Sequence, residues 1–329
     1  MTNKTLNWGL LSTARINRAL ISPLRVSKRN QLLAVGSRSQ ESADGYAREW
    51  KIPRAHGSYE ALLADPEIDV IYNPLPNHLH AMWTIKAVEA GKHVLCEKPL
   101  ALSVDEVDAM QEAARKNGRV IAEAFMYRHH PQTLKVQELV KNGSIGILKL
   151  IRGSFSYVLN RDGDVRLDPA MGGGSIWDVG CYPINYARTV VGENPLEVFG
   201  WQVTGSTGID ETFVGQMRFG NDIHAQFDSS FVIPFHWFME IIGSEGTLNI
   251  PKPFKPGIDE KIYLTRGDKT ETIKIKGQEL YIGEVEDIAD AILLGRDQHI
   301  SLDDSRANVA VISALLESAQ TGKPVKLDL

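Results

Sequence analysis

The chain has 329 residues, of which 43% are hydrophobic and 23% charged, and a formal net charge of -5. This length predicts about two domains, and the acidic balance argues against nucleic acid or an anionic membrane as partner. Cys96 and Cys181 are the two cysteines and lie far apart, which disfavours a disulfide framework or a zinc site and favours a reducing cytoplasm. No secretion signal and no apolar stretch of roughly 20 residues is present, so we expect a cytoplasmic protein outside the membrane.

Residues 1–124 alternate short apolar runs with amphipathic stretches, the pattern of parallel βαβ units. This alternation predicts an α/β nucleotide-binding domain with a doubly wound parallel sheet. The predicted strands are 6–12, 32–39, 68–76, 92–99 and 119–127, and the predicted helices are 42–50, 59–65 and 78–92.

Residues 125–329 follow a different pattern, which predicts an α+β domain. Helical stretches at 133–146 and 174–191 come first, and helices at 284–295 and 307–322 end the chain, the last of them able to pack back on the first domain. Between them, alternating segments bounded by Gly, Asn, Asp and Pro predict antiparallel strands at 196–205, 211–220, 223–232, 236–250, 261–267 and 271–277.

The turn after the first strand is the first candidate for cofactor binding. A dinucleotide-binding turn normally has three glycines, which let the backbone approach a pyrophosphate at a helix N-terminus. Here all three are replaced, although Ser and Ala are small enough for a tight turn, and a turn without any ligand would have the same pattern. The residues concerned are Ser12, Thr13, Ala14, Arg15 and Ile16.

The end of the second strand favours NADP over NAD. An NAD site calls for an acidic residue there, to hold the ribose 2′-hydroxyl. The chain has Ser37 and Arg38 instead, and a guanidinium with small hydroxyls suits a 2′-phosphate. The alternative is a surface arginine that caps the next helix.

A His-x-His pair follows the strand at 68–76. Two imidazoles are common metal ligands, but no third ligand follows at suitable spacing, so we expect no metal. The loop is better suited to lining the cofactor or to a structural role. Its candidate cofactor residues are Pro74, Leu75, Asn77 and His80.

Lys98 follows an apolar strand in the stretch Glu97-Lys98-Pro99. Ser103 can cap the next helix and Glu106 can complete a capping box, so the stretch is a strand, a tight turn and a helix start. That turn lies at the carboxyl edge of a parallel sheet, where ligands bind. Lys98 is either a solvated ammonium or, if desolvated, a lysine with a lowered pKa that takes part in proton transfer.

The second half offers a partner for this lysine. Asp178 and Tyr182 are four residues apart, so they share a face of the helix that Ser175 is expected to cap. The glycines before this helix lack the Lys-Ser/Thr pair of a P-loop, and the Tyr-x-x-x-Lys spacing of short-chain dehydrogenases is absent. Tyr182 is either a packing tyrosine or part of a proton-transfer group.

Together these segments resemble the glucose–fructose oxidoreductase, inositol dehydrogenase and rhizopine-catabolism (Gfo/Idh/MocA) family. The resemblance extends over the chain in blocks at 8–16, 90–101, 123–132, 172–185 and 241–248. It implies a Rossmann domain followed by a domain with a large, mostly antiparallel open sheet. One face of that sheet is commonly a subunit interface, which implies a homodimer or homotetramer.

The resemblance also implies roles for individual residues. Lys98 matches the catalytic lysine, and Asp178 and Tyr182 match an Asp…Tyr/His pair whose Tyr form belongs to the glucose–fructose oxidoreductase and dihydrodiol dehydrogenase branch. Glu97 and Arg128 are expected near the cofactor and Arg166 near the substrate. The Lys98–Pro99 bond is expected to be cis, against a base rate of about 5% for X–Pro bonds.

The expected function is therefore NADP-dependent hydride transfer to or from a hydroxyl or carbonyl carbon of a sugar, a diol or a related polyol. Aldose 1-dehydrogenase and dihydrodiol dehydrogenase activities fit first, and a ketosugar reductase of the same family is the alternative. A non-catalytic NADP-sensing regulator is the alternative from another class. Retention of Lys98, Asp178 and Tyr182 argues against the regulator.

Overall fold

The computed structural model describes residues 4–161 and 163–329. Its first sheet has six strands in the order β3-β2-β1-β4-β5-β6, and all neighbouring pairs are parallel. This order reverses direction between β1 and β4, which is the arrangement that opens a ligand crevice at the carboxyl ends of the strands. The strands are β1 (Leu6–Leu11), β2 (Asn30–Gly36), β3 (Arg54–His56), β4 (Val70–Asn73), β5 (His93–Glu97) and β6 (Ile121–Ala124).

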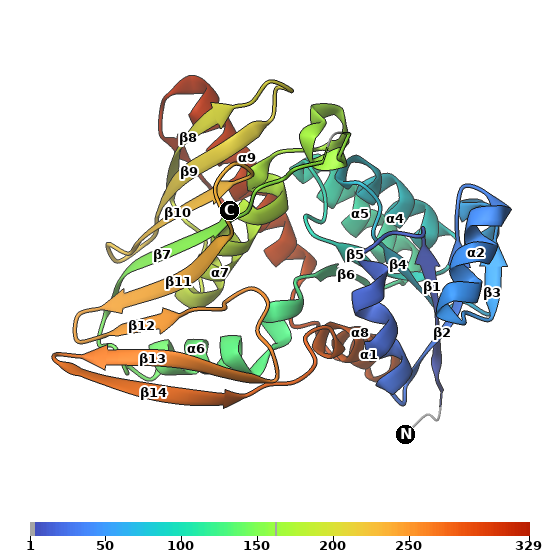
Figure 1. Ribbon diagram of the computed structural model, residues 1–329, viewed down its shortest axis with the longest axis horizontal. Helices are drawn as coiled ribbons and strands as arrows, with labels where there is room; N and C mark the ends of the chain where they lie inside the picture. Colours follow the sequence, from blue (N-terminus) through green and yellow to red (C-terminus); the bar gives the residue numbers. More distant parts are fainter. Residues whose placement is uncertain (1–3, 162) are drawn as a thin grey trace. The chain divides into compact units, whose positions relative to one another are not determined.

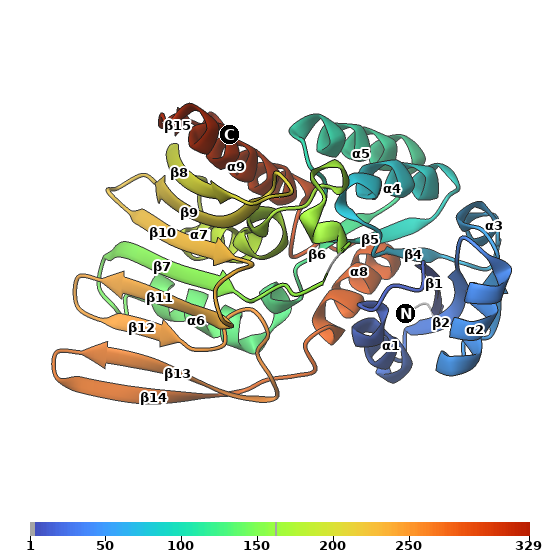
Figure 2. The same cartoon turned by 45° about the horizontal axis from the view of Figure 1, so that its top comes forward.

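Helices cover both faces of this sheet, and Figure 2 shows α4 and α5 on one face with α1 and α8 on the other. The helices are α1 (Asn17–Val26), α2 (Gln40–Trp50), α3 (Tyr59–Leu63), α4 (His80–Glu89), α5 (Val104–Asn117) and α8 (Ile282–Leu294). Arg29, immediately before β2, pairs with Glu286 and Asp290 of α8. These elements form one compact unit, which consists of the described chain up to Met126 together with Tyr281–Arg306.

The second unit, Tyr127–Leu280 with Ala307–Leu329, is built on a nine-stranded sheet in the order β14-β13-β12-β11-β7-β10-β9-β8-β15 (Figure 1). Its strand pairs are antiparallel except β7 with β10, which run parallel. The strands are β7 (Leu148–Ser156), β8 (Glu197–Thr204), β9 (Asp210–Arg218), β10 (His224–Ser230), β11 (His236–Gly243), β12 (Thr247–Ile250), β13 (Asp259–Arg266), β14 (Lys269–Lys276) and β15 (Val325–Lys326).

One face of the second sheet is covered by helices, and its core lies between the two layers. The covering helices are α6 (Pro131–Lys141), α7 (Cys181–Val191) and most of α9 (Leu302–Thr321). Inward-facing Phe213 and Phe227 stack 6.1 Å apart, and Leu315 of α9 reaches the backbone of β9 at Gly215. Alternation along β9 therefore buries one face of the strand and leaves the other outward.

The expected fold class is confirmed: a Rossmann-type parallel sheet and a mostly antiparallel second sheet. Several elements were not among the predicted ones, namely α1, β3, β7 and β15. The helix expected at 133–146 runs from Pro131 to Lys141, and the last helix begins at Leu302. Among the described residues, no helix is long and apolar enough to cross a membrane.

Helix capping agrees with the sequence at one site and differs at another. Ser103 caps α5 by accepting the N–H of Glu106, and the Glu106 carboxylate accepts the N–H of Leu102 rather than that of Ser103. Ser175 does not cap its helix with its side chain: its own backbone is already helical, and its hydroxyl donates to Asp210 of β9. The prediction of a Ser175 cap was wrong because a tertiary partner binds this hydroxyl.

Candidate active site

In the first unit, the predicted cofactor residues follow the carboxyl ends of four parallel strands. Ser12 follows β1, Ser37 follows β2, Pro74 follows β4 and Lys98 follows β5. Parallel strands place their carboxyl ends at one edge of the sheet, so the topology gathers these positions there. The edge is the one at which the reversal between β1 and β4 lies.

The turn after β1 takes a backbone conformation that normally needs glycine. Ser12 has φ 124° and is buried, and such a φ strains a residue with a side chain. Two hydrogen bonds hold the turn: Ser12 Oγ accepts the N–H of Ala14 at 3.2 Å, and the Asn17 amide donates to Ser12 O at 2.8 Å. The turn is therefore as tight as a glycine-rich one, and α1 starts without a side-chain cap.

The end of β2 presents one buried hydroxyl and one exposed cation. The Ser37 N–H donates to His56 O, and Ser37 is buried, whereas Arg38 is exposed. Arg38 makes no hydrogen bond or ion pair within residues 4–161 and 163–329, and Ser39 rather than Arg38 caps α2. The helix-capping alternative for Arg38 is thus wrong, and its guanidinium can take a phosphate at this edge.

His80 joins the loop after β4 to the turn after β5. Its Nδ1 lies 2.7 Å from Pro99 O and its Nε2 lies 2.7 Å from Leu75 O. Burial lowers the pKa of His80 to about 4, so the ring is neutral and donates to one carbonyl at a time. With both nitrogens facing carbonyl oxygens, His80 is not available as a metal ligand, and it shapes the two loops from the interior. Asn77 begins the short 3₁₀-helix between β4 and α4.

Lys98 stands in the turn after β5, and its bond to Pro99 is cis, as expected. Next to it, the hydroxyl of Tyr72 donates to Glu97 Oε1 at 2.5 Å. Tyr72 is fully buried, and burial followed by the charge of Glu97 raises the pKa of its hydroxyl. Tyr72 therefore stays protonated and holds the Glu97 carboxylate. The sequence alone did not reveal Tyr72 as a site residue, because a tyrosine within the apolar strand β4 resembles an ordinary core residue.

In the second unit, Tyr182 lies in the first turn of α7, within an aromatic cluster. Its ring centroid is 5.4 Å from that of Phe155, 5.5 Å from Phe254 and 5.9 Å from Tyr127. The ring is buried, so it has the packing role considered from the sequence. Packing of this kind also fixes the direction of a phenol, which a positioned proton carrier needs.

Asp178 lies four residues earlier, in a π-helix (η5, Ile176–Gly180) that runs directly into α7. Its Oδ2 accepts hydrogen bonds from Arg166 Nε and from the hydroxyl of Tyr157, each at 2.9 Å. Asp164 contacts Arg166 from the other side, 3.2 Å from Nη1. The adjacent Asp178 charge, the largest cause, raises the pKa of Arg166, and burial with that same charge raises the pKa of Tyr157.

These contacts bring together Arg166 and Asp178, two of the predicted site residues, and add Tyr157, which the sequence did not reveal. Tyr157 follows the strand β7, which also went unrecognised. A carboxylate that accepts hydrogen bonds from a guanidinium and a phenol stays charged, and its orientation is fixed. Asp178 is thereby suited to orienting a hydroxyl group rather than to carrying a proton.

Arg128, the remaining predicted cofactor residue, belongs to the second unit and is buried. Its Nη1 donates to Asn185 Oδ1 at 3.2 Å, and the hydroxyl of Tyr127 donates to the same oxygen at 2.6 Å. Lys98 belongs to the first unit, and Asp178 and Tyr182 belong to the second.

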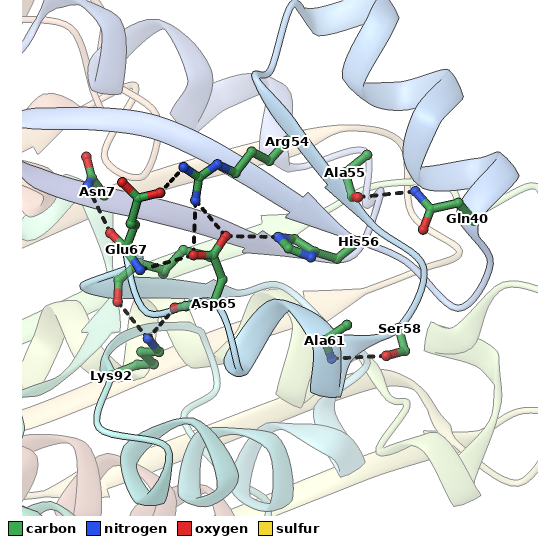
Figure 3. Close-up of polar contacts among 11 residues, drawn as sticks. Asn7, Gln40, Arg54, Ala55, His56, Ser58, Ala61, Asp65, Glu67 and Lys92 are labelled. Atoms are coloured by element: carbon green, nitrogen blue, oxygen red, sulfur yellow. Dashed lines mark hydrogen bonds and ion pairs between the residues drawn. The ribbon is translucent and has the colours of Figure 1, made fainter.

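A second polar cluster in the first unit lies away from this edge (Figure 3). Asp65 accepts hydrogen bonds from Arg54 and contacts His56 at 3.2 Å, and the buried Lys92 ammonium donates to the backbone oxygens of Asp65 and Ile68. Lys92 immediately precedes β5, whereas Arg54 and His56 begin and end β3, so these contacts join the edge strand β3 to the loop before β4 and to the start of β5. The cluster therefore stabilises the sheet at its β3 side.

A parallel sheet in the order 3-2-1-4-5-6 and a second domain with a held carboxylate and a buried phenol define a two-domain, nucleotide-dependent oxidoreductase. Comparison with known proteins agrees. Residues 6–125 match the family model described as "Oxidoreductase family, NAD-binding Rossmann fold", and residues 133–249 match the "GFO/IDH/MocA C-terminal domain". The chain belongs to the Gfo/Idh/MocA oxidoreductase family and is an oxidoreductase that acts on CH–OH donors.

Three proteins similar to this chain follow. D-xylose 1-dehydrogenase (NADP(+)) 2 of Haloferax volcanii is 36% identical over 98% of this chain and 99% of the relative. Trans-1,2-dihydrobenzene-1,2-diol dehydrogenase of Danio rerio is 34% identical over 75% of this chain and 74% of the relative. The crystal structure of a 3-ketoreductase from Actinomadura kijaniata, in complex with NADP and TDP-benzene, has a TM-score of 0.91 at 26% identity and covers 96% of this chain and 98% of that one.

Proposed function

We propose that this protein is an NADP-dependent dehydrogenase that oxidises a hydroxyl group of a sugar or a diol, with Lys98, Tyr182 and Asp178 as its catalytic residues. The observation that carries the proposal is the arrangement around Asp178, whose carboxylate is held by Arg166 and Tyr157 one turn before Tyr182. A polyol hydroxyl needs an oriented acceptor and a proton carrier, and this segment offers both.

The residues at the sheet edge fit NADP. Arg38 is exposed beside the buried Ser37, and no carboxylate ends β2, so a 2′-phosphate finds a forked donor and no like charge. The tight turn at Ser12–Ile16 suits the pyrophosphate, and the residues from Pro74 to Asn77 with Glu97 would line the nicotinamide end. Bound NADP⁺ supplies a hydride acceptor at this edge. NAD remains the less favoured cofactor.

The proton is assigned to Tyr182 and Lys98 together. Tyr182 accepts the proton of the substrate hydroxyl, and the ammonium of Lys98 stabilises the phenolate character that Tyr182 needs for this step. Asp178 orients the substrate hydroxyl or the Tyr182–Lys98 pair. In the reductive direction the same tyrosine donates the proton. In this proposal Lys98 and Tyr182 act as one coupled group, because interacting groups titrate as a unit.

The names of the relatives support the proposed substrate class. Their printed names include a xylose dehydrogenase, a dihydrobenzenediol dehydrogenase and a 3-ketoreductase. Aldose 1-dehydrogenase or dihydrodiol dehydrogenase activity comes first in the proposal and a ketosugar reductase second. A non-catalytic NADP-sensing regulator is the alternative from another class.

The outer face of the second sheet supports the proposal of a homodimer or homotetramer. Trp201, Val203 and Val214, on the neighbouring strands β8 and β9, are 56%, 61% and 43% exposed. An apolar group of this kind on an uncovered sheet face is typical of a protein–protein interface. Sedimentation of the purified protein measures the oligomer, and a strictly monomeric chain would contradict this part.

The function is tested by offering the purified protein NADP⁺ or NAD⁺ with a panel of aldoses and vicinal diols, and NADPH with keto sugars, while following NADPH absorbance. The expected result is turnover of at least one aldose or diol with NADP⁺ preferred over NAD⁺. Turnover limited to keto sugars would favour the reductase. Tight NADP⁺ binding with no turnover on the whole panel would favour the regulator.

A further inference from the structure

The first residues of the π-helix that carries Asp178 donate hydrogen bonds to a buried carboxylate of the neighbouring sheet. Oδ2 of Asp210, the first residue of β9, accepts the N–H of Ile176 at 2.8 Å and the hydroxyl of Ser175 at 2.7 Å. Asp210 and Ser175 are both buried, and within residues 4–161 and 163–329 no cation pairs with Asp210. Burying a carboxylate without a cation is unfavourable unless hydrogen bonds compensate it. The two donors at the start of the helix provide that compensation.

Two glycines let the same segment lie directly against the sheet. Gly174 has φ +123°, and a Cβ there would lie 2.1 Å from Asp210 Oδ1. A Cβ on Gly180 would lie 2.9 Å from the hydroxyl oxygen of Ser229 on β10. That hydroxyl is also 3.0 Å from Ser175 Oγ. The start of the π-helix is therefore hydrogen-bonded to β9, and its end packs closely against β10.

Asp178 lies between these two points, and Tyr182 follows Gly180 by two residues in the helix that continues as α7. A π-helical turn holds more residues than an α-helical turn and is a common feature of functional sites. The residue at which the turn begins sets the direction in which Asp178 and Tyr182 project. Asp210 hydrogen-bonds to Ser175 and Ile176, the residues at which this turn begins.

We propose that Asp210 is a positioning residue of the reaction, which aims Asp178 and Tyr182 by anchoring the first turn of their helix to β9. This inference rests on the proposed function of Asp178 and Tyr182. Asp210 itself takes no part in the chemistry. It acts through the backbone of Ile176 and the hydroxyl of Ser175.

The anchor is sensitive to pH. Burial raises the pKa of Asp210 to about 6, and the hydrogen bonds from Ser175 and Ile176 lower it in part. The ionised form accepts these bonds more strongly and puts a negative charge at a helix N-terminus, where it is favourable. Activity is therefore expected to fall as pH decreases through about 6 and Asp210 takes up a proton.

Three other carboxylates lie on the elements around Asp210. Glu211, the next residue of β9, lies over Gly205, and Asp228 of β10 accepts the hydroxyl of Ser154 at 2.6 Å. On the π-helix, Asp178 is bound by Arg166 and Tyr157. In the part of the chain that the structure describes, none of these three carboxylates hydrogen-bonds to Asp210, and the Asp210→Asn variant decides whether the acid limb comes from Asp210.

The test compares Asp210→Ala with Asp210→Asn and with the control Asp228→Ala, which removes a carboxylate bonded to serine on the adjacent strand. Asp210→Ala is expected to lower kcat about 10- to 100-fold, because small displacements of catalytic groups have effects of this size, while Kd for NADP⁺ stays at the wild-type value. Asp210→Asn keeps an acceptor oxygen, so it should recover much of kcat but lack the acid limb. Asp228→Ala should behave as the wild type.

Hydrogen exchange of residues 174–182 gives a readout that does not depend on turnover. Asp210→Ala should speed exchange in this segment, and Asp228→Ala should not. Wild-type kcat and exchange in Asp210→Ala would overturn the proposal. If Asp210→Ala does not fold, Ser175→Ala removes one of the two donors: a reduced kcat with unchanged NADP⁺ binding supports the anchor, and an unchanged kcat overturns it.

The two proposals fail in different ways. If the wild-type protein turns over no sugar, diol or keto sugar, the proposed function fails. The exchange comparison of Asp210→Ala with Asp228→Ala still decides whether Asp210 anchors the segment. If the wild type is active and Asp210→Ala is equally active, the positioning role alone is rejected.

Discussion

Arg166 and Asp178 form an ion pair in which the guanidinium Nε lies 2.9 Å from the carboxylate Oδ2, and the hydroxyl of Tyr157 donates to that same oxygen. The Asp178 side chain is largely buried, at 15% exposure. Two donors on one carboxylate oxygen fix both the charge and the direction of Asp178. The contacts therefore make Arg166 and Tyr157 supports of Asp178, which we propose as a catalytic residue.

Tyr157→Phe is expected to lower kcat/KM about 10- to 100-fold, the effect of losing one hydrogen bond to a charged group. Arg166→Met should have a larger effect, because it leaves the Asp178 charge without its cation. Steady-state kinetics with NADP⁺ and the best sugar or diol measure both. Arg152→Met is the matched control, since Arg152 pairs with Glu240 on the sheet. Wild-type kinetics in Tyr157→Phe would show that its bond to Asp178 has no part in turnover.

Tyr182→Phe and Lys98→Met should each lower kcat/KM about 10²- to 10⁴-fold, the range of general acid–base catalysis. Because the proposed mechanism makes the two groups act as a unit, the double variant should lose little more than either single one. Tyr186→Phe is the control, since Tyr186 lies one turn further along α7 and stacks on Tyr127. If Tyr182→Phe and Lys98→Met both kept the wild-type kcat/KM on the true substrate, the proposed proton transfer would be wrong.

Arg38→Ala should raise Kd for NADP⁺ about 10- to 100-fold and leave Kd for NAD⁺ unchanged, because only NADP⁺ carries the 2′-phosphate. The binding is measured by calorimetry at two salt concentrations, and the difference between the cofactors should shrink at the higher one. Arg48, an exposed arginine on α2, provides the control variant Arg48→Ala. Equal losses for NADP⁺ and NAD⁺ would place Arg38 away from the 2′-phosphate.

Ser12→Gly should be more stable than Ser12→Ala by about 1–2 kcal/mol. Both variants lose the hydrogen bond from the N–H of Ala14 to Ser12 Oγ, but only glycine takes φ 124° without strain. Denaturant midpoints with equal slopes measure the difference in the free energy of unfolding. Equal stability of the two variants would mean that the turn relaxes around alanine.

We expect His93 to make the free energy of unfolding depend on pH. Its Nδ1 accepts the N–H of Val120 at 2.9 Å, so the folded state needs the neutral ring. Burial, followed by the charge of Arg119, lowers the pKa of His93 to about 4. Since the unfolded chain takes up the proton near the ordinary pKa of about 6.5, the free energy of unfolding should fall as pH decreases from 6.5 toward 4.

His93→Asn isolates this effect, because an amide oxygen can accept the N–H of Val120 but does not titrate in this range. Urea unfolding at several pH values should show a shallower decline in the variant than in the wild type. His80 is present in both proteins and cancels in the comparison. Parallel pH curves would show that His93 does not contribute.

Several features were predictable from the sequence because they depend on local pattern. Alternating apolar runs predicted the parallel and antiparallel halves, and the Ser103 cap placed Lys98 between a strand end and a helix start. The strand β7 escaped notice although it lies inside the second sheet, between β11 and β10. On its core face Gly153 stands between Ile151 and Phe155, so the apolar alternation that normally identifies a strand is interrupted.

Local patterns predicted the two kinds of sheet, and the resemblance of short motifs indicated the family and the candidate residues Lys98, Asp178 and Tyr182, because periodicity, caps and motifs involve residues close in the chain. The contacts that hold Asp178 and the start of its helix became visible in the folded chain. Tyr157 reaches Asp178 from 21 positions away, and Asp210 reaches Ile176 from 34. Such contacts depend on strand order and on helix packing against the sheet, which local patterns do not specify.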